Sequence, residues 1–397
     1  MARALLMLIA IAALVAGCNH APPPDAPVRQ PGPGTAVDVQ ETEKGQVRVV
    51  EVAVDLEHPW GLAFLPDARM LVTERAGRLR IVQPDGRVSA PLAGLPDIFV
   101  DGQAGLLDVA VSPTFAEDGL VYFAFAEPSF RGNKAGTAVA RARLTDTALE
   151  QVEVIYRQEP KLSSGTHVGS RLVFADDGNL FVTQGENRVA AAAQALDKLQ
   201  GKLVRIRPDG SIPGDNPFVG RNDARPEIWS YGHRNMQGAA INPATRQLWT
   251  SEHGPMGGDE LNIPQPGRNY GWPIVTSGVD YSGQPVPGST GESAPGMEPP
   301  HHVWKKSPAL SGMAFYDGKG LPQWRGNLFL GALVEANLIR LELDGDEIVH
   351  EERLLGARRE RIRDVREGPD GMLWLLTDEE RGKLLRIEPG AVTPTRL

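Results

Sequence analysis

Two short segments of this chain hold side chains that could bind an anion beside a cation. Segment 231–238 places Arg234, Asn235 and Gln237 within four positions between two glycines. A guanidinium can hold carboxylate or quinone oxygens through two parallel hydrogen bonds. Segment 251–263 adds carboxylates on a backbone that glycine and proline allow to bend sharply, and carboxylates and carbonyls are the ligands that Ca²⁺ prefers. Together the segments predict a pocket for a planar, anionic, oxygen-rich ligand next to a hard cation.

A histidine and a glutamine stand in two other glycine-rich segments. His167 lies among serine and glycine residues, which leave its imidazole accessible for acid–base chemistry near neutral pH. Gln103 is placed in the same way, with glycines close on both sides. The ordinary alternative for His167 is a loop histidine that bonds to backbone. For Arg234 it is a salt bridge, either at the surface or between blades of the β-propeller that the repeats below predict.

Two arginines near the C-terminus form a third candidate. Arg361 and Arg363 alternate on a predicted strand, so both point to the same side. Two guanidinium groups on one face repel each other unless an anion lies between them. The alternative is that they pair with acidic neighbours such as Asp364 or Glu367, in a region that is rich in arginine.

These segments, in this order, resemble the soluble pyrroloquinoline quinone (PQQ)-dependent sugar dehydrogenases, and in particular their aldose sugar dehydrogenase branch. The resemblance runs from about residue 49 to residue 389. It implies that an aldose is oxidised at C1 to a lactone by hydride transfer to PQQ, and that the electrons then pass to an unidentified acceptor.

The resemblance also assigns roles to single residues. His167 matches the general base, and Glu186 stands where the family has an aspartate that orients this base. Arg234 would neutralise the charge that develops on the quinone. The residues that match cofactor contacts come from three separate segments: Gln103, Arg234, Asn235, Arg361 and Arg363.

Two calcium positions follow from the same resemblance. The backbone carbonyls of Gly254 and Pro255 match a calcium that touches PQQ, and Glu260 and Tyr270 match a second calcium. Turn capping in solvent is the alternative for Glu260. One position departs from the family, because many relatives carry a lysine at the quinone where this chain has Val334.

Composition and charge limit the class of partner. A formal net charge of -9 argues against nucleic acid, which requires a basic face. The hydrophobic content of 41% is sufficient for a packed core, and 44 glycines and 33 prolines are typical of a β protein with many tight turns. A small neutral substrate such as a sugar is compatible with this net charge. The chain is expected to be a monomer or homodimer.

The N-terminus reads as an export signal that ends at the only cysteine, Cys18. We expect residues 1–18 to be a lipoprotein-type signal peptide and residues 19–46 to be a proline-rich disordered tether. Residues 47–390 would form the folded domain and residues 391–397 a tail. These features predict a periplasmic protein with a lipid anchor at Cys18, and the resemblance to bacterial lipoproteins implies, through Asn19, that the anchor lies in the outer membrane. An ordinary signal peptide and a membrane anchor that is never cleaved are the alternatives.

The folded region repeats one pattern six times, an apolar strand followed by a Pro/Asp/Gly turn and a second strand. Short strands in repeating units predict an all-β fold, a six-bladed β-propeller of four-stranded antiparallel blades. Segment 47–54 would pair near residues 384–387 and close the ring. Helix is scarce, and segment 190–199 is the best candidate for one. A pair of β-sandwiches is the competing architecture.

In a propeller, the candidate residues would meet at one mouth of the central channel, because they mostly precede inner strands. Two other functions remain open at this level. A Ca²⁺-dependent propeller lactonase would need converging acidic ligands at the channel centre and would not need the Arg361/Arg363 pair. A non-catalytic carbohydrate-binding propeller would have lost cofactor affinity through changes such as Val334.

Overall fold

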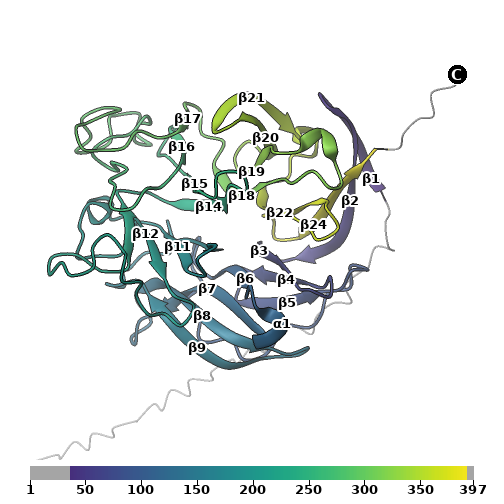
Figure 1. Ribbon diagram of the computed structural model, residues 1–397, viewed down its shortest axis with the longest axis horizontal. Helices are drawn as coiled ribbons and strands as arrows, with labels where there is room; N and C mark the ends of the chain where they lie inside the picture. The colour runs from purple at the N-terminus through teal and green to yellow at the C-terminus, as the bar shows by residue number, and fades with distance from the viewer. Residues whose placement is uncertain (1–35, 391–397) are drawn as a thin grey trace, which may run out of the picture.

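The computed structural model describes residues 36–390, which form a ring of six antiparallel β-sheets (Figure 1). The inner strand of each sheet contacts the inner strands of its two neighbours, and the last contacts the first, so the ring is closed. The predicted six-bladed β-propeller is therefore confirmed. In cyclic order the inner strands are β3 (Pro59–Phe64), β6 (Leu106–Val111), β10 (Gly169–Phe174), β14 (Met236–Ile241), β18 (Leu310–Phe315) and β22 (Ile362–Glu367).

The first three blades continue outward from β3, β6 and β10. Blade 1 adds β4 (Met70–Glu74) and β5 (Arg78–Val82). Blade 2 adds β7 (Leu120–Pro128), β8 (Ala135–Leu144) and β9 (Leu149–Arg157). Blade 3 adds β11 (Leu180–Gln184), β12 (Lys202–Ile206) and β13 (Ile228–Tyr231).

The other three blades continue outward from β14, β18 and β22. Blade 4 adds β15 (Leu248–Glu252), β16 (Asp259–Asn262) and β17 (His302–Trp304). Blade 5 adds β19 (Leu328–Ala332), β20 (Asn337–Asp344) and β21 (Glu347–Leu354). Blade 6 adds β23 (Leu373–Thr377), β24 (Gly382–Pro389), β2 (Gly45–Leu56) and β1 (Ala36–Thr42).

Two blades depart from the predicted four strands. Blade 1 has three strands, and an irregular segment covers its outer edge through hydrogen bonds from Ser89 N to Ile81 O (2.8 Å) and from Leu92 N to Leu79 O (2.9 Å). Blade 6 has five strands, because the N-terminal segment adds two. The predicted closure is confirmed, since Val49 pairs with Ile387 in the register of β2 and β24.

The predicted tether is too long at its C-terminal end. Residues 36–42 form β1, which pairs with β2, so the folded domain begins before residue 47. The physical reason is that the proline-rich composition ends at Pro33, after which apolar and polar residues alternate as in a strand. The predicted signal peptide, residues 19–35 of the predicted tether and the tail at 391–397 lie outside the described residues.

Helices are short, as expected. They are α1 (Phe115–Asp118) and the 3-10 turns η1 (Ala190–Ala193), η2 (Pro322–Trp324) and η3 (Gly356–Arg358). The helix predicted for 190–199 is wrong beyond its first turn. There the ammonium of Lys202 binds the carbonyls of Ala192 (2.8 Å) and Ala193 (3.0 Å), which a longer helix would have used. Among the described residues, no helix has the length and apolar character needed to cross a membrane.

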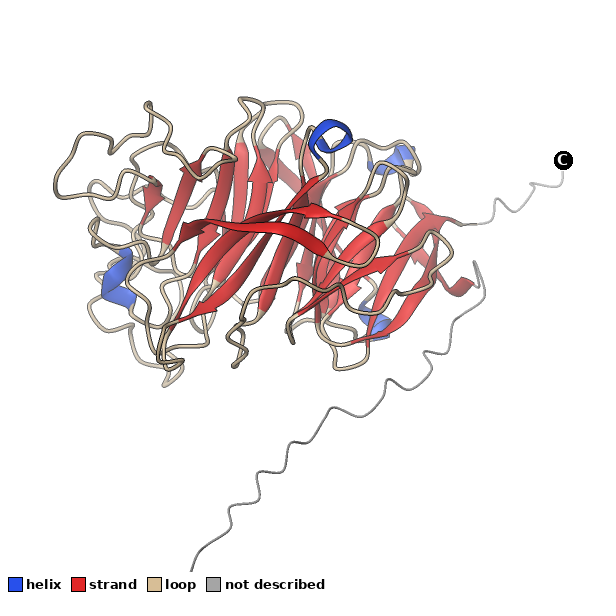
Figure 2. Cartoon of the chain, turned by 90° about the horizontal axis from the view of Figure 1, so that it is seen from below, coloured by secondary structure: helices blue, strands red, loops and turns tan. Residues whose placement is uncertain are grey.

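The strands run between two faces that are made of loops (Figure 2). Inner strands begin with buried residues and end partly exposed in blades 1 to 4 and 6. Because every blade repeats the same strand order, the segments that enter the six inner strands lie at the same face. This face therefore gathers polar residues that are far apart in sequence.

Candidate active site

A cavity of about 1010 Å³ opens at this face. Its wall comes from five of the six blades and includes an indole, that of Trp60. Five of the predicted site residues line it: Gln103, Gly254, Pro255, Arg361 and Arg363. The remaining predicted residues, His167, Glu186, Arg234, Asn235, Glu260 and Tyr270, lie around it and are connected to it by the contacts described below.

Arg361 and Arg363 face the same cavity, and the anion between them is Asp378. The carboxylate Oδ2 of Asp378 accepts hydrogen bonds from Arg361 Nη2 (3.2 Å) and Arg363 Nη2 (2.6 Å). Burial alone would raise the pKa of Asp378, but the two guanidinium groups hold it well below its ordinary value. Both arginines thus pair with an acidic residue, as the alternative expected, but the residue is Asp378 and not Asp364 or Glu367. The second carboxylate oxygen of Asp378 lies 3.3 Å from His58 Nδ1.

His167 is buried behind Gln103 and is oriented by Glu186. Its backbone N–H donates to Gln103 Oε1 (2.9 Å), and its Nδ1 lies 2.6 Å from Glu186 Oε2. The residue has a positive φ of 50°, a conformation that is uncommon for a residue other than glycine. Burial lowers the pKa of His167 below its ordinary value of 6.5, although Glu186 opposes this shift. The longer side chain of Glu186 thus reaches the imidazole as an aspartate would.

Arg234 and Asn235 are joined to the same group. The backbone carbonyl of Arg234 accepts from Glu186 N (3.0 Å), and Asn235 Oδ1 accepts from Gly169 N (3.1 Å). The guanidinium of Arg234 donates to the carbonyl of His253 (3.1 Å), which lines the cavity. Sequence reasoning thus correctly placed residues of blades 2, 3 and 4 together.

A donor set for a cation lies at the turn after β15. Gly254 and Pro255 both line the cavity, and no hydrogen bond to either carbonyl oxygen is present within residues 36–390. The turn is fixed from behind, because Asp259 Oδ1 accepts from Gly254 N (2.9 Å). Two free carbonyl oxygens at a cavity wall are the kind of ligand that Ca²⁺ takes.

The second predicted calcium position contains the buried carboxylate of Glu252 and the half-buried carboxylate of Glu260. Asn262 Nδ2 donates to Glu252 Oε1 (3.0 Å) and Glu260 Oε2 (3.2 Å), while Asn262 Oδ1 is buried without a partner. Burial and the neighbouring charge of Glu252 raise the pKa of Glu260 to about 8. His233 connects this pair to Tyr270, since it bonds Glu252 (2.9 Å) and stacks on the tyrosine ring. A cation would relieve the repulsion between the carboxylates and use the orphaned oxygen.

The two positions rely mainly on backbone and amide oxygens. Within the described part of the chain, no group of three or more His, Cys, Asp or Glu side chains converges as a metal site. The donor chemistry therefore suits a hard cation that accepts carbonyl oxygens and does not suit a transition metal.

The cavity wall is strongly cationic around a single carboxylate, Asp378. The five cationic side chains are Arg75, Lys305, Lys306, Arg361 and Arg363. Val334, at the position of the family lysine, also lines the cavity, and its N–H donates to the carbonyl of Pro308 (3.0 Å). Lys305 and Lys306 precede Pro308 on the same side of the wall. The two lysines therefore place positive charge near Val334, although the family lysine itself is absent.

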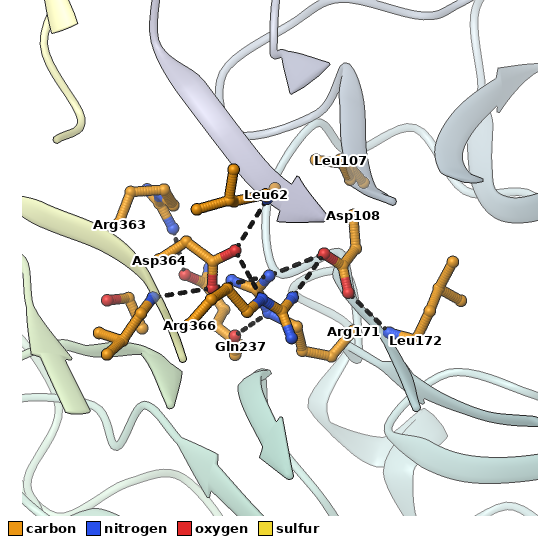
Figure 3. Close-up of polar contacts among 12 residues, drawn as sticks. Leu62, Leu107, Asp108, Arg171, Leu172, Gln237, Arg363, Asp364 and Arg366 are labelled. Carbon is orange, nitrogen blue, oxygen red and sulfur yellow. Dashed lines mark hydrogen bonds and ion pairs between the residues drawn. The ribbon is translucent and has the colours of Figure 1, made fainter. Parts of the chain in front are cut away.

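Beneath the cavity, a cluster of four charged residues joins the inner strands (Figure 3). Arg171 binds Asp108 (2.8 Å) and Asp364 (3.1 Å), and Arg366 binds the same two carboxylates at 3.0 and 3.1 Å. The guanidinium of Arg171 lies 4.3 Å from the ring centroid of Trp60, which belongs to the cavity wall. The central cluster, defined as these four residues, forms a rigid support under the site.

Sequence reasoning missed Asp378, His58 and the central cluster. Asp378 had a usable signal, because it follows β23 directly and strand ends of this kind meet at the cavity face. Asp108 and Arg171 had another, since each is a charged residue inside an otherwise buried inner strand, where only a partner makes a charge tolerable. His58 had no such signal, because a histidine in a charged segment between Asp55 and Pro59 looks like an ordinary surface residue.

Comparisons with known proteins agree with this geometry. A family model described as "Glucose / Sorbosone dehydrogenase" matches residues 56–386. The aldose sugar dehydrogenase YliI of Escherichia coli K12 is 52% identical over 344 residues, which cover 86% of this chain and 92% of that protein. The crystal structure of the E. coli aldose sugar dehydrogenase in its apo form has a TM-score of 0.84 at 50% identity, covering 87% of this chain and 100% of that one. A PQQ-bound aldose sugar dehydrogenase from Streptomyces coelicolor has a TM-score of 0.72 at 28% identity, covering 90% and 100%.

Proposed function

This chain belongs to the glucose/sorbosone dehydrogenase family, and we propose that it oxidises aldose sugars at C1 to lactones with PQQ as cofactor and Ca²⁺ as metal. The observation that carries the proposal is the cavity wall, where five cationic side chains face one carboxylate. A tricarboxylated quinone supplies the negative charge that such a wall requires. An electron acceptor that is not yet identified completes the reaction.

The residues of the cavity fit this cofactor. Arg361 and Arg363 would hold its carboxylates, Gln103 would donate a hydrogen bond, and Arg234 and Asn235 would face the quinone oxygens. The fit is supported by buried nitrogens that have no partner within the described residues: Arg234 Nε, Asn235 Nδ2 and Arg363 Nε. When bound, PQQ supplies the hydride acceptor, and Ca²⁺ at the carbonyls of Gly254 and Pro255 supplies a Lewis acid.

The chain itself supplies the base and the fixed charge. Glu186 accepts the Nδ1 proton of His167, so Nε2 carries the free lone pair and can take the proton of the C1 hydroxyl. In the described part of the chain, the partner of the imidazole is Glu186 at Nδ1, and Nε2 has no hydrogen-bond partner. Arg234 is held by contacts on both its backbone and its guanidinium, so its positive charge needs no rearrangement during the reaction.

The pH dependence of kcat/KM should report the titration of His167. Activity requires the neutral imidazole, and burial lowers its pKa, so the rate should fall only as pH drops below 6.5. Glu186→Gln removes a charge that raises this pKa, and the acid limb should move to lower pH. Arg188→Gln removes a charge that lowers it, and the limb should move to higher pH. Shifts of the same sign in both variants would contradict the assignment of His167.

Calcium should stabilise the fold through Glu260. A ligand at 100 times its Kd adds about 2.7 kcal/mol to the free energy of unfolding, so melting temperatures in Ca²⁺ and in EDTA should differ by several degrees. Glu260→Gln should remove most of this difference. The matched control is Glu367→Gln, because burial and Asp317 raise the pKa of Glu367 to about 7 at a carboxyl pair elsewhere. An equal loss in both variants would contradict a calcium site at Glu260.

A cofactor titration tests the proposed function directly. Protein that lacks cofactor is titrated with PQQ in the presence of Ca²⁺, followed by absorbance, and then assayed for dye reduction with a panel of aldoses. Saturable binding with sugar-dependent dye reduction is the expected result. Binding without reduction would favour a non-catalytic propeller, and lactone hydrolysis without binding would favour a lactonase.

The structure gives no specific support to the lactonase alternative. The carboxylates at the channel centre, Asp108 and Asp364, are each bonded to both Arg171 and Arg366. They are therefore neutralised by the protein and are not arranged as free ligands of a metal. The Arg361/Arg363 pair, which a lactonase does not need, lines the cavity.

We also propose that the protein is exported to the periplasm and anchored to the outer membrane by a lipid on Cys18. The support is the sequence alone, since residues 1–35 lie outside the described part of the chain. Labelling of the cells with a radioactive fatty acid should mark the wild-type protein and not a Cys18→Ser variant. Equal labelling of both would contradict the anchor.

A further inference from the structure

Several of the large hydrophobic side chains that are exposed in the described residues belong to loops at the cavity face. We define the mouth ring as six of them: Phe130, Val189, Met256, Val279, Tyr281 and Val334. Phe130 is completely exposed, and Val334 is 68% exposed. Apolar side chains that gather on one face of a soluble protein are a feature of interaction sites.

Contacts place the members of the mouth ring at the same face. Met256, Tyr281 and Val334 line the cavity itself. Val279 is paired with Met256, whose N–H donates to its carbonyl (2.8 Å). Val189 follows Arg188, whose guanidinium lies 5.8 Å from the ring centroid of Tyr281.

Phe130 joins the ring from blade 2. It lies in the turn between β7 and β8, at the strand ends that point to the cavity face. At the base of this turn, Lys161 Nζ donates to the carbonyl of Pro128 (3.0 Å), and the segment of Lys161 leads directly to His167.

Exposed cations accompany the apolar side chains. Arg131 and Lys134 flank Phe130, Arg188 precedes Val189, and Lys305 and Lys306 lie beside Val334. Within residues 36–390, Arg131, Lys134, Arg188 and Lys305 form no ion pair, and Lys306 is 3.8 Å from Glu335. The carboxylate of the cavity wall, Asp378, is already neutralised by two arginines. Two further carboxylates stand in these loops: Glu335 lies near Lys306 and Arg353, and Asp280 lies in the field of Arg188. The face is therefore apolar, with more cations than carboxylates among the side chains named here.

We propose that the mouth ring is the docking surface for an acidic, one-electron redox protein that serves as the electron acceptor. This inference rests on the proposed function, because oxidation of one aldose to a lactone releases two electrons and two protons. In a partner whose redox group is a haem, each electron reduces one iron from Fe³⁺ to Fe²⁺. Two acceptor molecules are then used per sugar, and the protons pass to water. An apolar patch within a charged rim is the usual form of a transient interface, and complementary charge speeds the encounter.

A membrane suits this face less well than a protein. The sugar must enter through the same mouth, and a bilayer pressed against the ring would close it. A redox protein that docks briefly between turnovers leaves the cavity open to the next sugar. The positive charge of the mouth favours both an acidic protein and an anionic membrane, so an experiment must distinguish these two partners.

The experiment uses an acidic c-type cytochrome as the probe and measures both binding and reduction. Binding is followed by surface plasmon resonance and does not depend on turnover. The double variant Phe130→Ser/Val189→Ser should weaken binding and lower kcat/KM for the cytochrome about tenfold, while dye reduction and PQQ binding stay unchanged. The matched control is Val219→Ser, which removes an exposed valine from outside the mouth ring. Raising the salt concentration should slow cytochrome reduction and leave dye reduction unaffected.

Three outcomes would overturn the inference. The first is equal binding of the acidic cytochrome by the wild type and the double variant. The second is equal or faster reduction of a basic cytochrome of similar potential. The third is sedimentation of the Cys18→Ser chain with phosphatidylglycerol vesicles that is lost in the double variant, which would assign the ring to a membrane. A failure of the proposed function is distinguishable, because it would abolish dye reduction in the wild type and leave the binding comparison intact.

Discussion

Replacing His167 with alanine is expected to lower kcat by about 10²–10⁴-fold and to leave PQQ binding unchanged. A positioned general base contributes a factor of this size. His167 is held for that task, with Nδ1 fixed 2.6 Å from Glu186 and its backbone N–H bonded to Gln103. The measurement is steady-state dye reduction with a saturating aldose, together with a PQQ titration of the same preparation. Partial recovery with added imidazole would show that the missing group is the base.

His58 is the competing base, because it lines the cavity and bonds Asp378. Asp378 also accepts hydrogen bonds from Arg361 and Arg363, so it orients His58 less strongly than Glu186 orients His167. His301→Ala is the matched control, since His301 bonds the carbonyl of Asp346 (2.7 Å) away from the cavity. Loss of turnover in His58→Ala with retention in His167→Ala would transfer the role of base to His58.

The fold could be predicted from the sequence because its information is local and repeated. Each blade shows its own strand, turn and strand, and six copies leave few other architectures. The departures occur where one copy differs, as in blade 1 with its irregular edge and in blade 6 with its added strand β1. Segment 190–199 failed for a different reason. Its helical composition is overridden by Lys202, a tertiary partner that takes the carbonyls of the first turn.

The candidate site could be predicted only in part. Gln103, Arg361 and Arg363 were found because their position before or at the start of inner strands indicates one face. Asp378 was missed because its role depends on the distance between two guanidinium groups, which spacing along the chain does not give. The mouth ring was missed as well, since exposed valines look like core valines in a sequence. Contacts between residues that are far apart in the chain thus cannot be predicted from residue types and their order alone.

Replacing Arg171 with methionine is expected to lower the free energy of unfolding by about 3–5 kcal/mol, the usual cost of breaking a buried ion pair on one side. Arg171 is 1% exposed and binds two carboxylates that are themselves fully buried. Its loss leaves Asp108 and Asp364 with only Arg366 between them, and their repulsion acts across inner strands of different blades. Denaturant unfolding of wild type and variant, compared at their midpoints, measures this effect.

Arg386→Met is the control for this prediction, because Arg386 also lies over an indole but does not belong to the central cluster. Arg386 lies 5.2 Å from the ring centroid of Trp374 and pairs with Glu388, but it is partly exposed, so its removal should cost only about 1 kcal/mol or less. The double variant Arg171→Met/Asp364→Asn should recover part of the stability, because it removes one of the two carboxylates that must otherwise share Arg366. If Arg171→Met costs no more than Arg386→Met, the central cluster is not a structural support. If the double variant is less stable than the sum of the single changes, the instability comes from lost packing on Trp60 and not from unpaired charge.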